Sequence, residues 1–300
     1  MAQTYNLNQA IITSAATQFE KRLENELVIG KLAKTELKSG IKMGDEVNVF
    51  MPAEANVTRW DGGDLKAPEK VNSGIVKVPI DQGYQVNFEL EKAKELQIVS
   101  ASNDVAAKLI DEFSSSAKYQ ARDIVDAYLA GLYGMSGHKE TNDGNAIAID
   151  ASHADRAYTI LANMKAKFSR VNAWKSDKML AFLPPEMIAV MLGMTFMQYT
   201  EMQVKDKALG EISKKAGWRI YESNNVAAVQ SGADTILNPI FGIEGETFAA
   251  PLQQSLELIP YMRDESINKA FKGTFVFGGS CPNSKKLGTA KVKVTLGSYS

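Results

Sequence analysis

Cysteine, histidine and long apolar runs are scarce in this chain, and each scarcity excludes a kind of chemistry or location. The one cysteine, Cys281, excludes an intrachain disulfide and a cysteine-based zinc site. The two histidines, His138 and His153, match no metal-ligand spacing, so we interpret them as ordinary solvent-facing residues. No apolar run is long enough to cross a bilayer, and residues 1–8 lack a signal-peptide pattern. These absences predict a reduced, cytoplasmic protein that does not enter the membrane.

An excess of charge of one sign is missing as well. Lys and Arg together number 34 and Asp and Glu number 35, so the formal net charge of the 300 residues is -1. A surface whose main task is to grip nucleic acid carries a basic excess, which this chain lacks. The hydrophobic share of 45% and the charged share of 23% are those of a folded globular chain of one or two domains.

No group of residues in the sequence has the spacing of a catalytic site. Cys281 has no histidine placed beside it by sequence, and it reads as a small, partly buried apolar residue. The glycine clusters at 242–245 and 278–279 lack the strand, loop and helix context of a phosphate-binding loop. We therefore predict no catalytic residue, no cofactor and no metal, and we expect that the protein is not an enzyme.

The strongest periodic pattern predicts one very long helix. Apolar residues recur every three or four positions from Val105 to Leu132, and Asn103 and Asp104 offer side-chain oxygens for its N-terminus. About 30 residues at a rise of 1.5 Å give a rod of roughly 45 Å. A rod of this length spans a whole subunit.

An alternating pattern before this helix predicts an extended antiparallel hairpin, from Asp45 to Leu90. Val47 and Val49 share one face of its first strand, and a polar tip contains Trp60, Asp61, Gly62, Gly63 and Asp64. A hairpin on its own is barely stable in water. We therefore expect it to lie against something outside its own strands.

The segments before the hairpin and after the long helix complete an α+β layout. Residues 5–37 carry a narrow helical stripe that includes Phe19 and Leu23, which favours an arm over a buried element. After the long helix the sequence predicts helices at 152–168, capped by Ser152, and at 185–191, opened by Pro185. The strands expected in the same region are 179–183, 218–222, 255–262, 273–277 and 290–296.

Six stretches, taken in this order, carry a resemblance to a known family. They are residues 40–49, 80–90, 109–132, 181–187, 210–212 with 217–224, and 248–249 with 273–278. They include the glycine-Asp-x-Val sequence that begins at Gly44, the strand that precedes the long helix, and the strand-Pro-helix unit at 181–187. Together they resemble a tailed-bacteriophage major capsid protein of the Hong Kong 97 type.

The resemblance implies an HK97-like fold with five parts. These are an N-terminal arm (1–43), an extended hairpin loop (44–90), a peripheral domain with the spine helix (91–150), a mainly axial domain (151–255), and closing strands that return to the peripheral domain (256–300). It also implies a coat protein that assembles through pentamers and hexamers into an icosahedral virion head around double-stranded DNA, in the host cytoplasm.

The residues expected at contacts between subunits follow from the same parts. They are Trp60, Asp61, Gly62, Gly63 and Asp64 at the hairpin tip, Phe19 and Leu23 in the arm, and the hinge glycines Gly40 and Gly44. The implied partners are further copies of the chain, a separate scaffolding protein, a portal, a decoration protein, and DNA contacted without sequence specificity. Two alternatives stay open: an encapsulin-like shell that encloses enzymes, and an α+β enzyme with a dimerisation hairpin.

Overall fold

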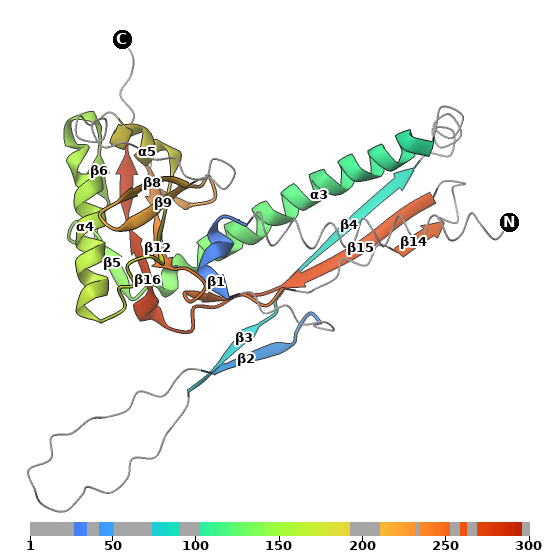
Figure 1. Cartoon of the computed structure of the whole chain (residues 1–300), viewed down its shortest axis with the longest axis horizontal. Coiled ribbons are helices and arrows are strands. Elements are labelled where there is room, and N and C mark those ends of the chain that lie inside the picture. The colour runs from blue at the N-terminus through green and yellow to red at the C-terminus, as the bar shows by residue number, and fades with distance from the viewer. Residues whose placement is uncertain are drawn as a thin grey trace, which may run out of the picture.

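The computed structural model has two regions: a compact body of sheets and helices, and a long helix that runs away from it beside two strands (Figure 1). A thin hairpin projects from the point where the two regions meet (Figure 1). The residues that the structure describes are 27–34, 42–50, 74–90, 103–192, 211–231, 234–252, 259–262 and 269–295.

The long helix is α3, Asn103–Gly131, with 29 residues. At 1.5 Å per residue it is about 43 Å long. The predicted helix is therefore confirmed, although the chain tightens into the 3-10 turn η2, Leu132–Met135, after Gly131.

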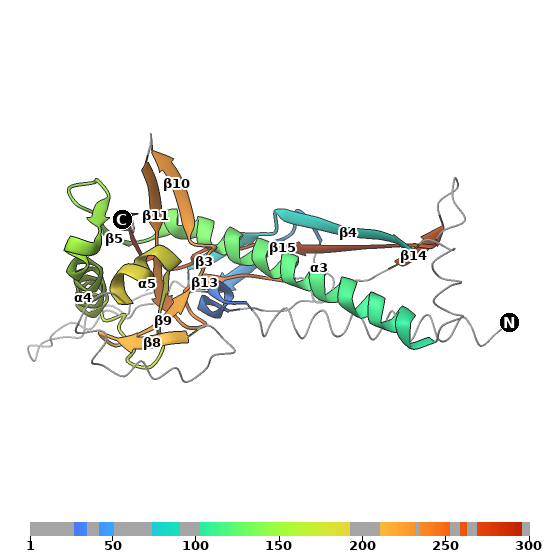
Figure 2. The same cartoon turned by 90° about the horizontal axis from the view of Figure 1, so that it is seen from above.

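A three-stranded sheet runs along this helix (Figure 2). Its central strand β15, Lys269–Phe277, pairs antiparallel with β4, Gln82–Leu90, along the whole of both strands. The short strand β14, Ile259–Met262, pairs with the other edge of β15.

The projecting hairpin is shorter than predicted. Strand β2, Glu46–Phe50, pairs antiparallel with β3, Ile75–Pro79, but β4 belongs to the sheet beside the helix. The predicted hairpin from 45 to 90 is wrong in this part, because β4 has an apolar face that packs against its own chain. The ring of Tyr84 on β4 stacks on Phe275 of β15, with 5.5 Å between the ring centroids.

The compact body is built on a six-stranded sheet in the order β5-β16-β12-β7-β9-β8. These strands are β5 His138–Glu140, β16 Leu287–Ala290, β12 Ile240–Ile243, β7 Met179–Leu183, β9 Trp218–Glu222 and β8 Glu211–Lys215. All five residues of β7 are buried, as expected for a strand covered on both faces. The helices of this region are α4, Asp155–Arg170, and α5, Pro185–Leu192.

A second, four-stranded sheet in the order β10-β11-β17-β6 lies in the same body. Its strands are β10 Ala227–Ser231, β11 Asp234–Asn238, β17 Val292–Val294 and β6 Ile147–Ile149. Mixed helices and strands throughout confirm the predicted α+β class.

The core of the body centres on Trp218, whose side chain is fully buried. Its ring meets Phe168 of α4 edge to face, with 5.5 Å between centroids, and its indole nitrogen donates to the carbonyl of Leu161 at 3.0 Å. A polar tip with a buried partner lets a large aromatic side chain lie inside without an unsatisfied donor. This contact fixes α4 against β9.

The start of α4 differs from the sequence prediction. A 3-10 turn, η3, Ala151–His153, precedes the helix, and the carboxylate of Asp150 accepts hydrogen bonds from the amides of Ser152 and His153. Asp150 is therefore the cap, and Ser152 is one of the residues capped.

Candidate assembly surfaces

The hairpin β2–β3 has one apolar face that consists of four valines, Val47, Val49, Val76 and Val78, which we call the valine face. In the antiparallel register Val47 is opposite Val78, and Val49 is opposite Val76. Val47 and Val78 are buried at the base, whereas Val49 and Val76 are half-buried farther out. The chain thus covers its own valine face only near the body.

The other face of the hairpin is exposed; it is polar at Glu46, Asn48 and Lys77 and carries the apolar Ile75 farther out. Lys77 and Glu46 form an ion pair at 2.7 Å whose two side chains are largely open to solvent. Such a pair adds little to stability in water. Two large apolar side chains at the hairpin are also exposed, Met43 by 64% and Ile75 by 54%. Exposed apolar area beside a thin projection is typical of a surface that another molecule covers.

The base of the hairpin is held by backbone contacts. The amide of Gly44 donates to the carbonyl of Ile80 at 2.9 Å, and the amide of Ile80 donates to the carbonyl of Asp45 at 3.0 Å. Gly44 has a φ of +92°, a conformation in which side chains are strained. Gly44 therefore lies at the turn that opens the hairpin, and its predicted role as a hinge stays a prediction.

A second contact at the base comes from Gly278, directly after β15. A Cβ atom on this residue would lie 2.0 Å from the carbonyl oxygen of Pro79. Only glycine lets the two backbone segments approach so closely. The backbone of the hairpin and the backbone of the sheet beside α3 are therefore in close contact at this point.

Most of residues 27–34 of the predicted arm are buried in the body, so the expectation of an element that is not buried is wrong for this part of the arm. It comprises the 3-10 turn η1, Ile29–Leu32, and the short strand β1, Ala33–Lys34. Strand β1 pairs in parallel with β13, Phe248–Ala249, and the side chains of Ile29 and Leu32 are fully buried. The carboxylate of Asp126, on α3, accepts hydrogen bonds from the amides of Val28 and Gly30.

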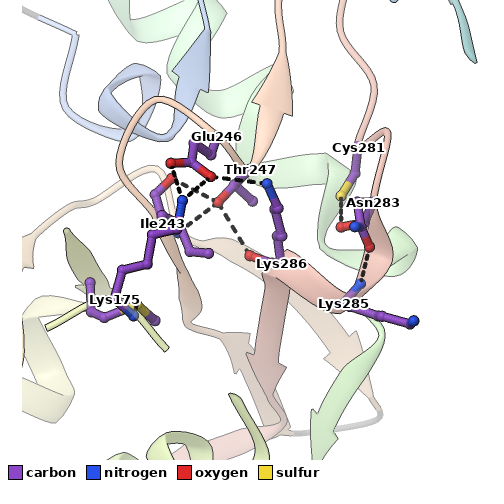
Figure 3. Close-up of polar contacts among 9 residues, drawn as sticks. Lys175, Ile243, Glu246, Thr247, Cys281, Asn283, Lys285 and Lys286 are labelled. Carbon is purple, nitrogen blue, oxygen red and sulfur yellow. Dashed lines mark hydrogen bonds and ion pairs between the residues drawn. The ribbon is translucent and has the colours of Figure 1, made fainter. Parts of the chain in front are cut away.

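The turn between β12 and β13 locks this segment from the other side (Figure 3). The hydroxyl of Thr247 donates to the carbonyl of Ile243 and accepts from the amide of the same residue, at 2.9 and 2.7 Å. Glu246 forms ion pairs with Lys175 at 2.5 Å and with Lys286 at 2.9 Å, and the hydrogen bond from Lys175 lowers the pKa of Glu246. The amides of Gly245 and Thr247 in this turn donate to carbonyls of η1.

The predicted contact residues are divided between described and undescribed parts of the chain. Gly44 is described, whereas Phe19, Leu23, Gly40 and the tip residues Trp60, Asp61, Gly62, Gly63 and Asp64 lie outside the described residues. Sequence reasoning missed the anchoring role of Asp126. Its position within the apolar stripe of the long helix, between Val125 and Leu129, was the one signal that could have found it.

The surroundings of Cys281 and His138 shift the pKa values of both side chains. Burial raises the pKa of Cys281 to about 11, so its thiol is a poor nucleophile at neutral pH. Burial lowers the pKa of His138, and a ring nitrogen of this residue lies 3.0 Å from the carbonyl of Lys285. Among the described residues, no three His, Cys, Asp or Glu side chains gather as a metal site would need.

No helix in the described part of the chain combines the length and the apolar run needed to cross a membrane.

The comparisons with known proteins rest on structure. No family model matches the sequence, and no curated protein is significantly similar to it. A chain from Mycobacterium phage Che8 superposes with a TM-score of 0.58 at 19% identity, covering 82% of this chain and 84% of that one. The asymmetric unit of the bacteriophage PhiM1 mature capsid gives 0.62 at 12% identity, covering 87% and 86%.

A bacterial shell matches equally well. The holo-SrpI encapsulin complex from Synechococcus elongatus PCC 7942 gives a TM-score of 0.58 at 10% identity, covering 90% of this chain and 89% of that one. The similarity extends over most of each chain, whereas identities this low establish the fold alone. The chain therefore has the fold of the Hong Kong 97 type, which phage capsid proteins and encapsulins share.

Proposed function

We propose that this chain is a major capsid protein that assembles through pentamers and hexamers into an icosahedral phage head around double-stranded DNA. The observation that carries the proposal is the valine face, which the chain itself covers only at the hairpin base, on a fold that known shells share. A neighbouring subunit that covers Val49 and Val76 would complete the burial. The hairpin tip at 60–64 and the arm residues Phe19 and Leu23 are proposed as further contacts with neighbours.

The assembly is proposed to rest on many modest contacts. Head-to-tail contacts close into rings when the rotation between subunits fits a five-fold or six-fold axis. Several neighbours, each bound weakly, give a stable shell that can still correct errors while it grows. The near-balance of 34 basic and 35 acidic residues suits this arrangement, because opposite charges on adjacent subunits help to set the register. The division into peripheral and axial domains, the hinge role of Gly40, and the scaffolding, portal and decoration partners belong to the same proposal.

A second candidate is an encapsulin-like compartment that encloses enzymes, in agreement with the similarity to the SrpI encapsulin. Both candidates predict shells, and they differ in what the shells contain. Particles with nuclease-resistant double-stranded DNA favour the phage head, whereas particles with a co-purifying enzyme and no DNA favour the compartment.

Size-exclusion chromatography with negative-stain electron microscopy of the purified protein tests the proposal. Shells, or rings of five and six subunits, are the expected result. A uniform dimer without larger species would contradict both shell candidates and would favour an enzyme with a dimerisation hairpin. Replacement of residues 60–63 by a short turn should leave the subunit folded by circular dichroism while shells no longer form. Normal shells from that variant would exclude the bridging role of the tip.

A further inference from the structure

The start of η1 lacks a cap from its own part of the chain. The first amides of a helical turn have no partner within the turn, and a nearby side-chain oxygen normally satisfies them. The residue at the N-cap position of η1 is Val28, which has no side-chain oxygen to offer and makes no such hydrogen bond. The amides at this turn must therefore find an acceptor elsewhere in the fold.

Asp126 of α3 supplies that acceptor from almost one hundred positions away in the sequence. Its Oδ2 atom accepts from the amide of Val28 and its Oδ1 atom accepts from the amide of Gly30, both at 2.9 Å. Each carboxylate oxygen thus serves a different amide. Hydrogen bonds to an ionised acceptor are about twice as strong as those between neutral groups.

The contact lies inside the protein. Asp126 is 1% exposed, and burial raises its pKa, while the amides of Val28 and Gly30 oppose this rise more than Arg122, on the same helix, does. A buried carboxylate whose acceptors are filled by backbone amides ties those amides firmly, because opening the contact would leave the charge without partners.

The same segment is held at its other end by the turn of Figure 3. The amide of Gly245 donates to the carbonyl of Lys31 at 2.9 Å, and the amide of Thr247 donates to the carbonyl of Leu32 at 3.0 Å. These contacts lie on the C-terminal side of η1, whereas Asp126 holds its N-terminal side. Among the described contacts, those of Asp126 therefore hold the N-terminal side of this segment.

We propose that Asp126 locks residues 27–34, which adjoin the predicted arm, to the spine helix, and that this lock fixes where Leu27 lies on the body. On the basis of the proposed shell function, the lock positions the arm for its contacts with neighbouring subunits. Asp126 is a positioning residue in this role, since it acts through the amides of Val28 and Gly30.

Hydrogen exchange at single-amide resolution, measured by mass spectrometry on unassembled subunits, tests the lock. In the native sequence the amides of Val28 and Gly30 should exchange as slowly as those of α3 around Asp126. In Asp126→Asn one oxygen becomes an NH₂ group, so one of the two amides loses its acceptor. We expect the exchange of that amide to rise about ten- to a hundred-fold, while β7 stays protected.

The matched control is Asp123→Asn, one turn earlier on the same helix. Asp123 is exposed, and its Oδ1 atom accepts from the side-chain amide of Asn225 at 2.7 Å, a bond that the asparagine oxygen can keep. Exchange at Val28 and Gly30 should not change in this variant. Fast exchange of both amides in the native protein, or unchanged exchange in Asp126→Asn, would overturn the lock, and the first result does not depend on any variant.

Assembly is scored separately by electron microscopy. Fewer or malformed shells from Asp126→Asn, with normal shells from Asp123→Asn, support the positioning role. Faster exchange with normal shells from Asp126→Asn would overturn that role while the lock stands. If the native chain forms no shells, the proposed function fails, and the exchange result still decides the lock.

Discussion

The hydroxyl of Tyr128 donates a hydrogen bond to the Oδ1 atom of Asp81, at 3.1 Å. Tyr128 is on the spine helix α3, and Asp81 lies between the hairpin strand β3 and the sheet strand β4. Burial and the carboxylate of Asp81 raise the pKa of Tyr128 to about 12, so the hydroxyl remains a donor across the physiological pH range. One side-chain contact therefore ties the helix to the hairpin base.

Loss of this hydroxyl should loosen the hairpin base. Tyr128→Phe keeps the ring, which meets Phe277 edge to face at 5.4 Å between centroids, and removes the donor alone. We expect the free energy of unfolding to fall by about 0.5–1 kcal/mol, because the contact is partly open to water. Chemical denaturation measures this change. A double-mutant cycle with Asp81→Ala, which removes the acceptor, should show coupling, and strictly additive effects would contradict the contact.

A methyl group at Gly278 should be far more damaging. Gly278→Ala would put a Cβ atom 2.0 Å from the carbonyl oxygen of Pro79 and 2.9 Å from the Cα atom of Ile80, both of them rigid backbone atoms. We expect a loss of about 1–3 kcal/mol or more in stability, measured by denaturation, and fewer assembled particles. Gly134→Ala is the control, because a Cβ atom there would meet no packed neighbour within 4 Å and its effect should be small. Equal stability of the two variants would contradict the close approach.

The two faces of β2 should respond differently to charge. Val49 is half-buried on the valine face, and Asn48 is exposed on the opposite face. Val49→Glu places a carboxylate where a neighbouring subunit is proposed to pack, so it should prevent shell formation while circular dichroism stays unchanged. Asn48→Glu places the same group opposite Lys77 and should permit shells. Electron microscopy of both variants decides the matter, and shells from Val49→Glu would contradict the proposed covering of this face.

Asp126 should make stability depend on pH in a direction opposite to that of most carboxylates. Burial raises its pKa from 3.8 to about 6, against the opposing effects of the amides of Val28 and Gly30 and of Arg122. The folded state then binds the proton more tightly than the unfolded state does. The stabilisation from this group is therefore complete below pH 3.8 and is lost as the pH rises through about 6.

The expected size of this effect is about 2 kcal/mol between pH 4 and 7. Denaturation of unassembled subunits across that range should show the native protein losing stability relative to Asp126→Asn, which does not titrate. The difference between the two proteins isolates Asp126 from all other titrating groups. A difference that stays constant with pH would show that the pKa of Asp126 is not raised.

Local patterns in the sequence were sufficient for most of the helices and strands. The three- and four-residue spacing of apolar residues through Leu109 and Leu129 predicted α3, because this spacing places them all on one face of a helix. The two prolines before Glu186 placed the start of α5, since proline fits the first turn of a helix. The α+β class followed from the order of these elements.

The pairing of the strands was harder to predict from the sequence. Alternation in β4 predicted a strand, but its partner is β15, almost two hundred residues later in the chain. Because β3 and β4 are close in sequence, local patterns favour a hairpin between them. The contact between the rings of Tyr84 and Phe275 favours pairing of β4 with the distant strand β15 instead. The error in the hairpin boundary has this origin.

What the sequence determined by itself is the set of elements, their order and the absence of a recognisable catalytic pattern, because each depends on residues a few positions apart. The tertiary structure alone decided which segments meet: the amides of Val28 and Gly30 with Asp126, and Gly278 with Pro79. These contacts join residues far apart in the chain, and their energy depends on burial and close approach, which exist only once the chain has folded.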